Sequence, residues 1–315
     1  MFWRDDVDPD HEPHRVLIKK GEFVDADRND RVVPYKIYYP VNHDMTDLPV
    51  IVWSHGLGGS RDGAAFLARF IASNGYVVVH SQHAGTDTGL WEGKPGHPWD
   101  VIRKAHIPRS ASLDRFRDIP FLLDCLEQYK AANSEIGEHM NLDVMGMCGH
   151  SFGALTTQVM AGMMFPNEDG VLEQIQEDRF KAGILYSFVP MGHLTDEDPE
   201  KVYGTISLPM LYMTGTADDS PVEHFDYTYR LPVYEKAGAD EKMLMILEGG
   251  DHMVFTGSRG KLDTYPKRKI HEEIIKISSL AYWEWYLKGD QRAKDWLTEG
   301  GFATYLGDEA NITVG

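Results

Sequence analysis

The chain alternates short apolar runs, rich in β-branched and aromatic residues, with longer stretches that repeat apolar residues at helical spacing. The short runs predict strands at Arg15–Lys19, Arg31–Tyr39, Val50–Ser54, Tyr76–His80, Leu142–Cys148, Ala182–Phe188, Pro209–Thr214 and Lys242–Leu247. The amphipathic stretches predict helices at Arg61–Ser73, Leu113–Tyr129, Phe152–Met164, Glu223–Ala237 and Arg268–Leu287. The first two runs suggest an antiparallel hairpin. The later runs are apolar almost throughout, as strands covered on both faces are.

This alternation is typical of a mostly parallel sheet with helices on both faces. We therefore expect an α/β fold with roughly eight strands. No linker-like tract, charge block or internal repeat interrupts the 315 residues, so we expect a single domain over residues 1–315. In such sheets functional sites lie beyond the carboxyl ends of the strands, which directs attention to the residues that follow each run.

The most informative of these positions is Ser151, in the segment Gly149-His150-Ser151-Phe152-Gly153. An apolar run precedes the segment and a helix-forming stretch follows it, so the pattern has the strand–turn–helix context of a nucleophile elbow. Such a turn forces the serine into a strained backbone conformation, and side chains at the two glycines would collide with the neighbouring elements. We therefore predict that Ser151 is a nucleophile.

A serine hydroxyl needs a base and an acid that orients the base, and with this motif the two follow in the order acid, then histidine. Asp218 comes just after the predicted strand Pro209–Thr214 and is the favoured acid, with Asp219 as an open alternative. His252 follows the next strand on a glycine-flanked loop and is the predicted base. His271, on the surface pattern of a helix, and His193, in an acidic loop, fit this role less well.

Acyl transfer also needs backbone donors aimed at the developing oxyanion. We predict that the N–H of Phe152, directly after the nucleophile, is one donor. The glycine-rich segment Ser54–Ser60 allows close approach of the backbone to a ligand, and we assign the second donor to the N–H of Leu57. The glycine patterns of phosphate-binding and dinucleotide-binding loops are absent from the sequence.

Composition narrows the function classes. Lys and Arg total 31 against 49 Asp and Glu, a net charge of −18, which argues against a nucleic-acid partner. No stretch is long and apolar enough to span a bilayer. The acidic N-terminus lacks the apolar core of a signal peptide, so the chain as given is expected to be cytoplasmic, or secreted or periplasmic if a leader was removed. Cys125 and Cys148 are expected to be buried core thiols.

No cofactor or metal is expected. The pairs His11–His14 and His80–His83 have a spacing of three residues, but neither has further ligands nearby in the sequence, so a structural or solvated role is predicted. His55 and His150 flank the site motifs and are expected to support the site through hydrogen bonds.

From Val50 to Leu287 the chain resembles α/β-hydrolase-fold serine esterases, in particular the dienelactone-hydrolase-like and platelet-activating-factor-acetylhydrolase-like branch. Bacterial cutinases (polyester hydrolases) and chlorophyllases are relatives of that branch. The resemblance is carried by residues 54–58, 72–78 and 149–153, by the loops of Asp218 and His252, and by residues 285–290. It implies Ser151 as nucleophile, His252 as base, and the N–H groups of Leu57 and Phe152 as oxyanion donors.

The sequence departs from this pattern at Tyr186-Ser187-Phe188. Acetylhydrolases of the branch place the acid here, and this chain has no carboxylate in the segment. The resemblance to cutinases and dienelactone hydrolases implies that the acid follows the next strand, which favours Asp218. Dienelactone hydrolases themselves use a cysteine nucleophile, whereas this chain has Ser151.

The connection from Ala84 to Ala111 is long for a strand-to-helix loop, and such loops are often functional. Its tryptophans Trp91 and Trp99 are expected to line the wall of a pocket for a small-molecule or polymeric ester. The leading interpretation is a serine carboxylic-ester hydrolase. An amidase or peptidase with the same residues, and a non-catalytic binding protein on the same fold, are the alternatives. The sequence does not indicate the oligomeric state.

Overall fold

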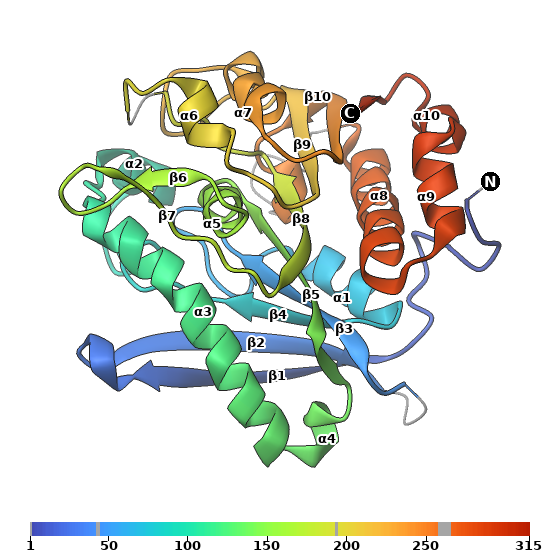
Figure 1. The fold of residues 1–315 in the computed structure, drawn as a ribbon, viewed down its shortest axis with the longest axis horizontal. Coiled ribbons are helices and arrows are strands. Elements are labelled where there is room, and N and C mark those ends of the chain that lie inside the picture. Colours follow the sequence, from blue (N-terminus) through green and yellow to red (C-terminus); the bar gives the residue numbers. More distant parts are fainter. Residues whose placement is uncertain (1, 42–44, 193–194, 258–265) are drawn as a thin grey trace.

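The computed structural model describes residues 2–41, 45–192, 195–257 and 266–315, and these form a nine-stranded sheet in the order β1-β2-β4-β3-β5-β8-β9-β10-β11 (Figure 1). Its strands are β1 (Val16–Asp25), β2 (Arg31–Pro40), β3 (Leu48–Ser54), β4 (Val77–Ser81), β5 (Met140–His150), β8 (Phe180–Tyr186), β9 (Met210–Ala217), β10 (Lys242–Asp251) and β11 (Ala310–Val314). Neighbouring strands from β4 to β10 are parallel. The β1/β2, β2/β4 and β10/β11 pairs are antiparallel.

Helices connect the strands, together with a small antiparallel pair, β6 (Met164–Pro166) and β7 (Leu172–Gln174). The α-helices are α1 (Ala65–Ser73), α2 (Pro98–Lys104), α3 (Arg109–Ala132), α4 (Ser134–Gly137), α5 (Phe152–Met160), α6 (Pro199–Tyr203), α7 (Leu231–Lys236), α8 (Arg268–Lys288), α9 (Gln291–Thr298) and α10 (Gly301–Leu306). Short 3₁₀ turns are η1 (Ala26–Arg28), η2 (Thr88–Leu90), η3 (Tyr227–Arg230) and η4 (Val254–Thr256).

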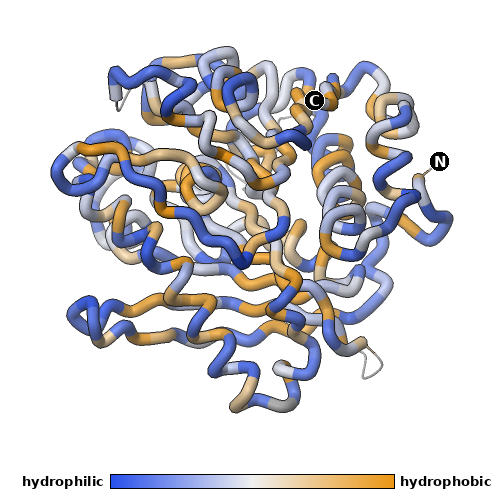
Figure 2. The backbone as a smooth tube through the Cα atoms, viewed as in Figure 1, coloured by the Kyte–Doolittle hydropathy of each residue, from blue (hydrophilic) through white to orange (hydrophobic). Residues whose placement is uncertain are grey.

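The continuous apolar runs of the sequence supply both faces of the sheet. Side chains alternate along β3, so that Ile51 and Trp53 join one apolar core and Val50 and Val52 join the other. Helices α1 and α8 to α10 cover the first face, and α3, α5, α6 and α7 cover the second. In Figure 2 the apolar stretches follow the interior strands, whereas polar residues follow the outer loops.

This architecture is the predicted α/β-hydrolase class, and the predicted β1–β2 hairpin is confirmed. The ninth strand, β11, is an antiparallel edge strand that the sequence interpretation missed. None of the helices in the described ranges combines the length and the low polarity that a bilayer crossing demands.

Several predicted helix boundaries were wrong. The predicted helix 223–237 begins only at η3, where the Asp226 side chain accepts a hydrogen bond from the Thr228 N–H. Helix α1 starts at Ala65 because Ala64 adopts a left-handed conformation with φ 50°. Helix α5 ends at Met160, two residues before Gly162, which has φ 111° and redirects the chain.

Candidate active site

Ser151 lies at a sharp turn between β5 and α5. Its backbone has φ 53° and ψ −118°, a strained conformation for a residue with a side chain, as the motif predicted. The turn is fixed on both sides: the Ser151 N–H donates to the Tyr186 carbonyl oxygen at 2.9 Å, and its carbonyl oxygen accepts from the Leu155 N–H at 3.0 Å. The serine is thereby held at the carboxyl edge of the sheet, at the N-terminus of a helix.

The two glycines of the turn are needed for close packing. A Cβ atom built on Gly153 would collide with the carbonyl oxygen of Ser54 at the end of β3. One built on Gly149 would collide with the Gly153 carbonyl. Helix α5 can therefore approach the sheet closely only because both positions lack side chains, which confirms the prediction for this turn.

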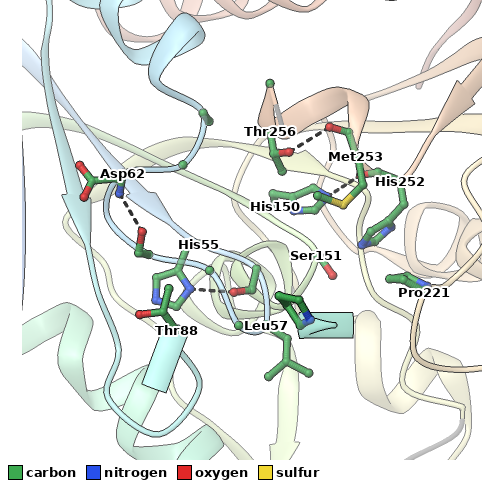
Figure 3. A pocket seen from close by; sticks show the side chains of 18 of the residues that line it. His55, Leu57, Asp62, Thr88, His150, Ser151, Pro221, His252, Met253 and Thr256 are labelled. Carbon is green, nitrogen blue, oxygen red and sulfur yellow. Dashed lines mark hydrogen bonds between the residues drawn. The ribbon is translucent and has the colours of Figure 1, made fainter. Parts of the chain in front are cut away.

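Asp218 and His252 directly follow β9 and β10, and their side chains meet. The Asp218 Oδ1 atom lies 2.7 Å from His252 Nδ1, and Asp218 is fully buried. Asp219 is exposed, whereas Asp218 is the candidate acid that contacts His252. His252 is nearly buried and lines the same cavity as Ser151 (Figure 3). The structure thus brings the predicted nucleophile, base and acid to one place.

Three groups that sequence reasoning did not identify surround the Asp218 carboxylate. Ser187 donates to Oδ1 at 2.9 Å, Arg230 donates to Oδ1 at 3.0 Å, and Thr214 donates to Oδ2 at 2.8 Å. Burial acts to raise the pKa of Asp218, but His252, Arg230 and the Thr214 hydroxyl outweigh it and hold the pKa below its usual value. The carboxylate is therefore ionised beside the His252 imidazole.

Ser187 occupies the position where the sequence comparison found no carboxylate. It has φ 55° and lies directly after β8, with its Oγ atom 2.8 Å from His252 Nδ1. Its side chain thus contacts both His252 and Asp218. The absence of a carboxylate at this position was visible in the sequence, but the contact itself was not.

His150 and His55 support the site through hydrogen bonds, as predicted. His150 Nε2 donates to the His252 carbonyl oxygen at 2.7 Å, which fixes the loop that carries the base. Burial, followed by the nearby His252, lowers the pKa of His150 to about 3, so its ring is neutral. His55 Nδ1 donates to the Gly56 carbonyl oxygen at 2.7 Å and its Nε2 accepts from the His83 N–H at 3.1 Å.

The two predicted oxyanion donors belong to different segments. Leu57 lies in the loop after β3 and lines the cavity. Phe152 is the first residue of α5, where backbone N–H groups have no partner within the helix. The Phe152 side chain contacts the Arg115 guanidinium, whose Cζ lies 4.6 Å from the ring centroid. The Phe152 side chain thus packs against Arg115, and Phe152 is not among the residues that line the cavity described below.

The cavity has a volume of about 780 Å³ and is bounded on one side by the 84–111 connection. Trp91, Trp99 and Ile102 of this connection line it, together with Pro221 and Val222. Trp91 also donates from Nε1 to the Gly58 carbonyl oxygen at 2.8 Å, which ties the connection to the Leu57 loop. This is the position that the sequence analysis expected for the two tryptophans.

The predictions for the other histidines and for the cysteines were only partly confirmed. His271, expected on a helix surface, is fully buried, because helix α8 packs against α1, α9 and η4. His193 lies outside the described residues. Cys148 is buried as predicted, whereas Cys125 is only half-buried. Across the described ranges, no cluster of three potential metal-ligating side chains occurs.

Comparison with known proteins points in the same direction as the site geometry. The family model described as "Platelet-activating factor acetylhydrolase, isoform II" matches residues 29–89, which include β2 to β4 and the Leu57 loop. A platelet-activating factor acetylhydrolase from Canis lupus familiaris is 23% identical over 259 residues, covering 69% of this chain and 50% of the relative. The chain thus spans about half the length of the curated relative it matches.

Proposed function

We propose that this chain is a serine carboxylic-ester hydrolase that acts through an acyl-enzyme on Ser151. The observation that carries the proposal is the buried Asp218–His252 pair, with 2.7 Å between Oδ1 and Nδ1, whose histidine lines the same cavity as a serine at φ 53°. Nucleophile, base and acid in this relation are the requirements of acyl transfer. The similarity to acetylhydrolases supports an ester as the substrate.

In the proposed mechanism the Ser151 hydroxyl attacks the ester carbonyl while His252 Nε2 removes its proton. Asp218 accepts a hydrogen bond from His252 Nδ1 and stabilises the imidazolium that forms. The N–H groups of Leu57 and Phe152 stabilise the oxyanion of the tetrahedral intermediate. His252 then protonates the leaving alcohol, and water activated by the same histidine releases the acid.

The first test is the rate of p-nitrophenyl acetate hydrolysis by the wild type and by Ser151→Ala. We expect the variant to lose turnover by a factor on the order of 10⁴ or more, because no other group takes the role of the nucleophile. Full activity in the variant would refute the proposal. Labelling of Ser151 by a fluorophosphonate, located by mass spectrometry, distinguishes an active hydrolase from a binding protein on the same fold.

We propose a wider range of ester substrates than the acetyl esters that the name of the relative indicates. The apolar cavity walls at Trp91, Trp99 and Ile102 favour an apolar or aromatic group on one side of the ester. A panel of p-nitrophenyl esters from acetate to palmitate, with methyl ferulate, a polyester film and the matching anilides, tests this. Faster cleavage of anilides than of esters would favour an amidase, and release from the film would support a cutinase-like activity.

A further inference from the structure

Arg115, on α3, is a fully buried cation whose role the proposed mechanism does not use. Burial lowers the pKa of its guanidinium to about 9, so it is still protonated near neutral pH. A buried charge is costly unless it is compensated. Among the described residues, the acceptors that Arg115 reaches are all neutral: Ser54 Oγ at 2.8 Å, Thr86 Oγ1 at 3.0 Å, Thr156 Oγ1 at 2.7 Å and the His55 carbonyl oxygen.

Two carboxylates, Asp118 and Asp87, favour the charged form of Arg115, and the described residues link Asp118 to it through a chain of hydrogen bonds. Ser54 Oγ lies 3.0 Å from His83 Nε2, and His83 Nδ1 lies 3.0 Å from Asp118 Oδ2. Burial lowers the pKa of His83 to about 4, so its ring is neutral and donates to the carboxylate from Nδ1. Asp118 is in turn paired with Arg31 at 2.7 Å. The carboxylate thus lies beyond Ser54 and His83, and the guanidinium itself is directed toward backbone and hydroxyl groups.

Three of these acceptors, Ser54, His55 and Thr156, lie on the two segments that carry the proposed oxyanion donors. Ser54 and His55 immediately precede the loop of Leu57, the first donor. Thr156 lies one turn after Phe152 on α5, and the same guanidinium lies 4.6 Å from the centroid of the Phe152 ring, whose backbone N–H is the second donor. One rigid planar group therefore contacts both segments at once.

We propose that Arg115 is the positioning residue of the oxyanion hole: it fixes the spacing between the Leu57 loop and the start of α5 and places a positive charge behind both donors. This inference rests on the proposed function. Preorganised donors in a buried site stabilise a developing negative charge without rearrangement. A change in the distance between the Leu57 loop and the start of α5 should therefore weaken the stabilisation of the transition state more than the binding of the substrate.

Two neighbouring threonines of α5 form a matched pair that tests this. Thr156 Oγ1 donates to the Phe152 carbonyl oxygen at 2.9 Å, and Thr157 Oγ1 donates to the Gly153 carbonyl oxygen at 3.0 Å. Both side chains are buried, and the contact with Arg115 distinguishes Thr156 from its neighbour. A purely structural role for these hydroxyls predicts equal effects of Thr156→Val and Thr157→Val on activity.

The experiment measures kcat and KM for p-nitrophenyl acetate in Thr156→Val, Thr157→Val and Arg115→Met. We expect kcat to fall about tenfold in Thr156→Val, with KM within twofold, and to change less than twofold in Thr157→Val. In Arg115→Met a fall on the order of 10²–10³ is expected, comparable with the loss of an oxyanion donor. The inhibition constant of a trifluoromethyl ketone, which forms a charged tetrahedral adduct, should rise in parallel with the fall in kcat/KM.

Each outcome is decisive. If Arg115→Met does not fold, the two threonine variants still test the inference. Equal kcat values in Thr156→Val and Thr157→Val, or an unchanged inhibition constant, would overturn it. If instead the wild type is neither labelled at Ser151 nor active on esters, the proposed function itself fails, which the labelling experiment shows separately.

Discussion

Asp218 and His252 face each other because a bulge in β10 shifts the register between their strands. Leu247 of β10 pairs with Gly215 of β9. Two residues further along β9, Ala217 pairs with Asp251, which is four residues further along β10. The β10 segment between these pairs is therefore two residues longer than its partner, and it contains Gly249 and Gly250. The strands approach closely here, because a Cβ atom on Gly215 would collide with the Gly250 carbonyl oxygen. Without the bulge, Gly250 would occupy the place beside Asp218, so this irregularity brings His252 to Asp218.

The first prediction concerns the choice between the two adjacent aspartates. Asp218→Asn should lower kcat for p-nitrophenyl acetate by a factor on the order of 10⁴, because an amide would stabilise the wrong tautomer of His252. Asp219→Asn is the matched control and should retain wild-type activity within about twofold, since Asp219 is exposed. Steady-state kinetics of both variants check this. A larger loss in the Asp219 variant would assign the acid to the other residue.

The second prediction uses the position of Ser187. Its Oγ lies 2.8 Å from His252 Nδ1, so a carboxylate introduced here would reach the base from a second strand. Aspartate tolerates the positive φ of 55° better than most residues do. The double variant Ser187→Asp/Asp218→Asn should therefore recover at least tenfold of the activity that Asp218→Asn loses.

The control for this rescue is Ser187→Asn/Asp218→Asn, which introduces a side chain of the same size without a charge. It should remain as inactive as the single Asp218 variant. Equal activities of the two double variants, with melting temperatures close to that of Asp218→Asn, would show that position 187 cannot orient His252.

The sequence sufficed for the main features of the fold and for the candidate site because these depend on local patterns. Apolar runs at strand length predicted the inner strands of the sheet. The glycines around Ser151 predicted its strained turn, and the order of Asp218 and His252 along the chain predicted their positions after consecutive strands. Residues on loops at strand ends meet at the same edge of a parallel sheet whatever the loop lengths.

The supporting residues could not be predicted because they act across large separations in the chain. Arg115 and Asp118 lie on the inward face of α3, among apolar residues such as Phe116, Ile119 and Leu122. The charged residues Arg115 and Asp118 at positions of the apolar face could have indicated a buried polar network. Their partners, however, are far away in the sequence. Arg230 fell inside a helix predicted too early, which concealed that it reaches Asp218.

The third prediction concerns pH-dependent stability through Asp118. Burial acts to raise its pKa, but Arg31 and His83 outweigh this and lower it from the usual 3.8 to about 2 in the folded chain. A depressed carboxylate pKa contributes stability fully above pH 4, and this contribution is lost as the pH falls toward 2. The shift corresponds to about 2 kcal/mol of unfolding free energy.

Asp118→Asn should therefore lose stability at pH 7, by roughly 3–5 kcal/mol for a broken buried pair, and should depend less on pH between 4 and 2. Urea denaturation at pH 7, 4, 3 and 2 measures both effects. Asp114→Asn is the control, because Asp114 is only half-buried and its carboxylate lies 3.9 Å from the same Arg31. An unchanged pH dependence in the Asp118 variant would contradict the assignment.

The fourth prediction separates the two tryptophans of the cavity. Trp91 donates to the Gly58 carbonyl beside Leu57, whereas Trp99 contributes to the wall of the cavity. Trp99→Ala should thus raise KM about tenfold for esters with long or aromatic groups and leave acetate within twofold, because tenfold corresponds to roughly 1.4 kcal/mol of lost apolar burial. Trp91→Phe keeps most of the apolar surface but loses the Nε1 donor, and should lower kcat for every ester alike. Tyr229→Ala, an exposed aromatic residue outside the cavity, is the control. A uniform rise in KM across the panel for Trp99→Ala would mean that Trp99 does not distinguish substrates.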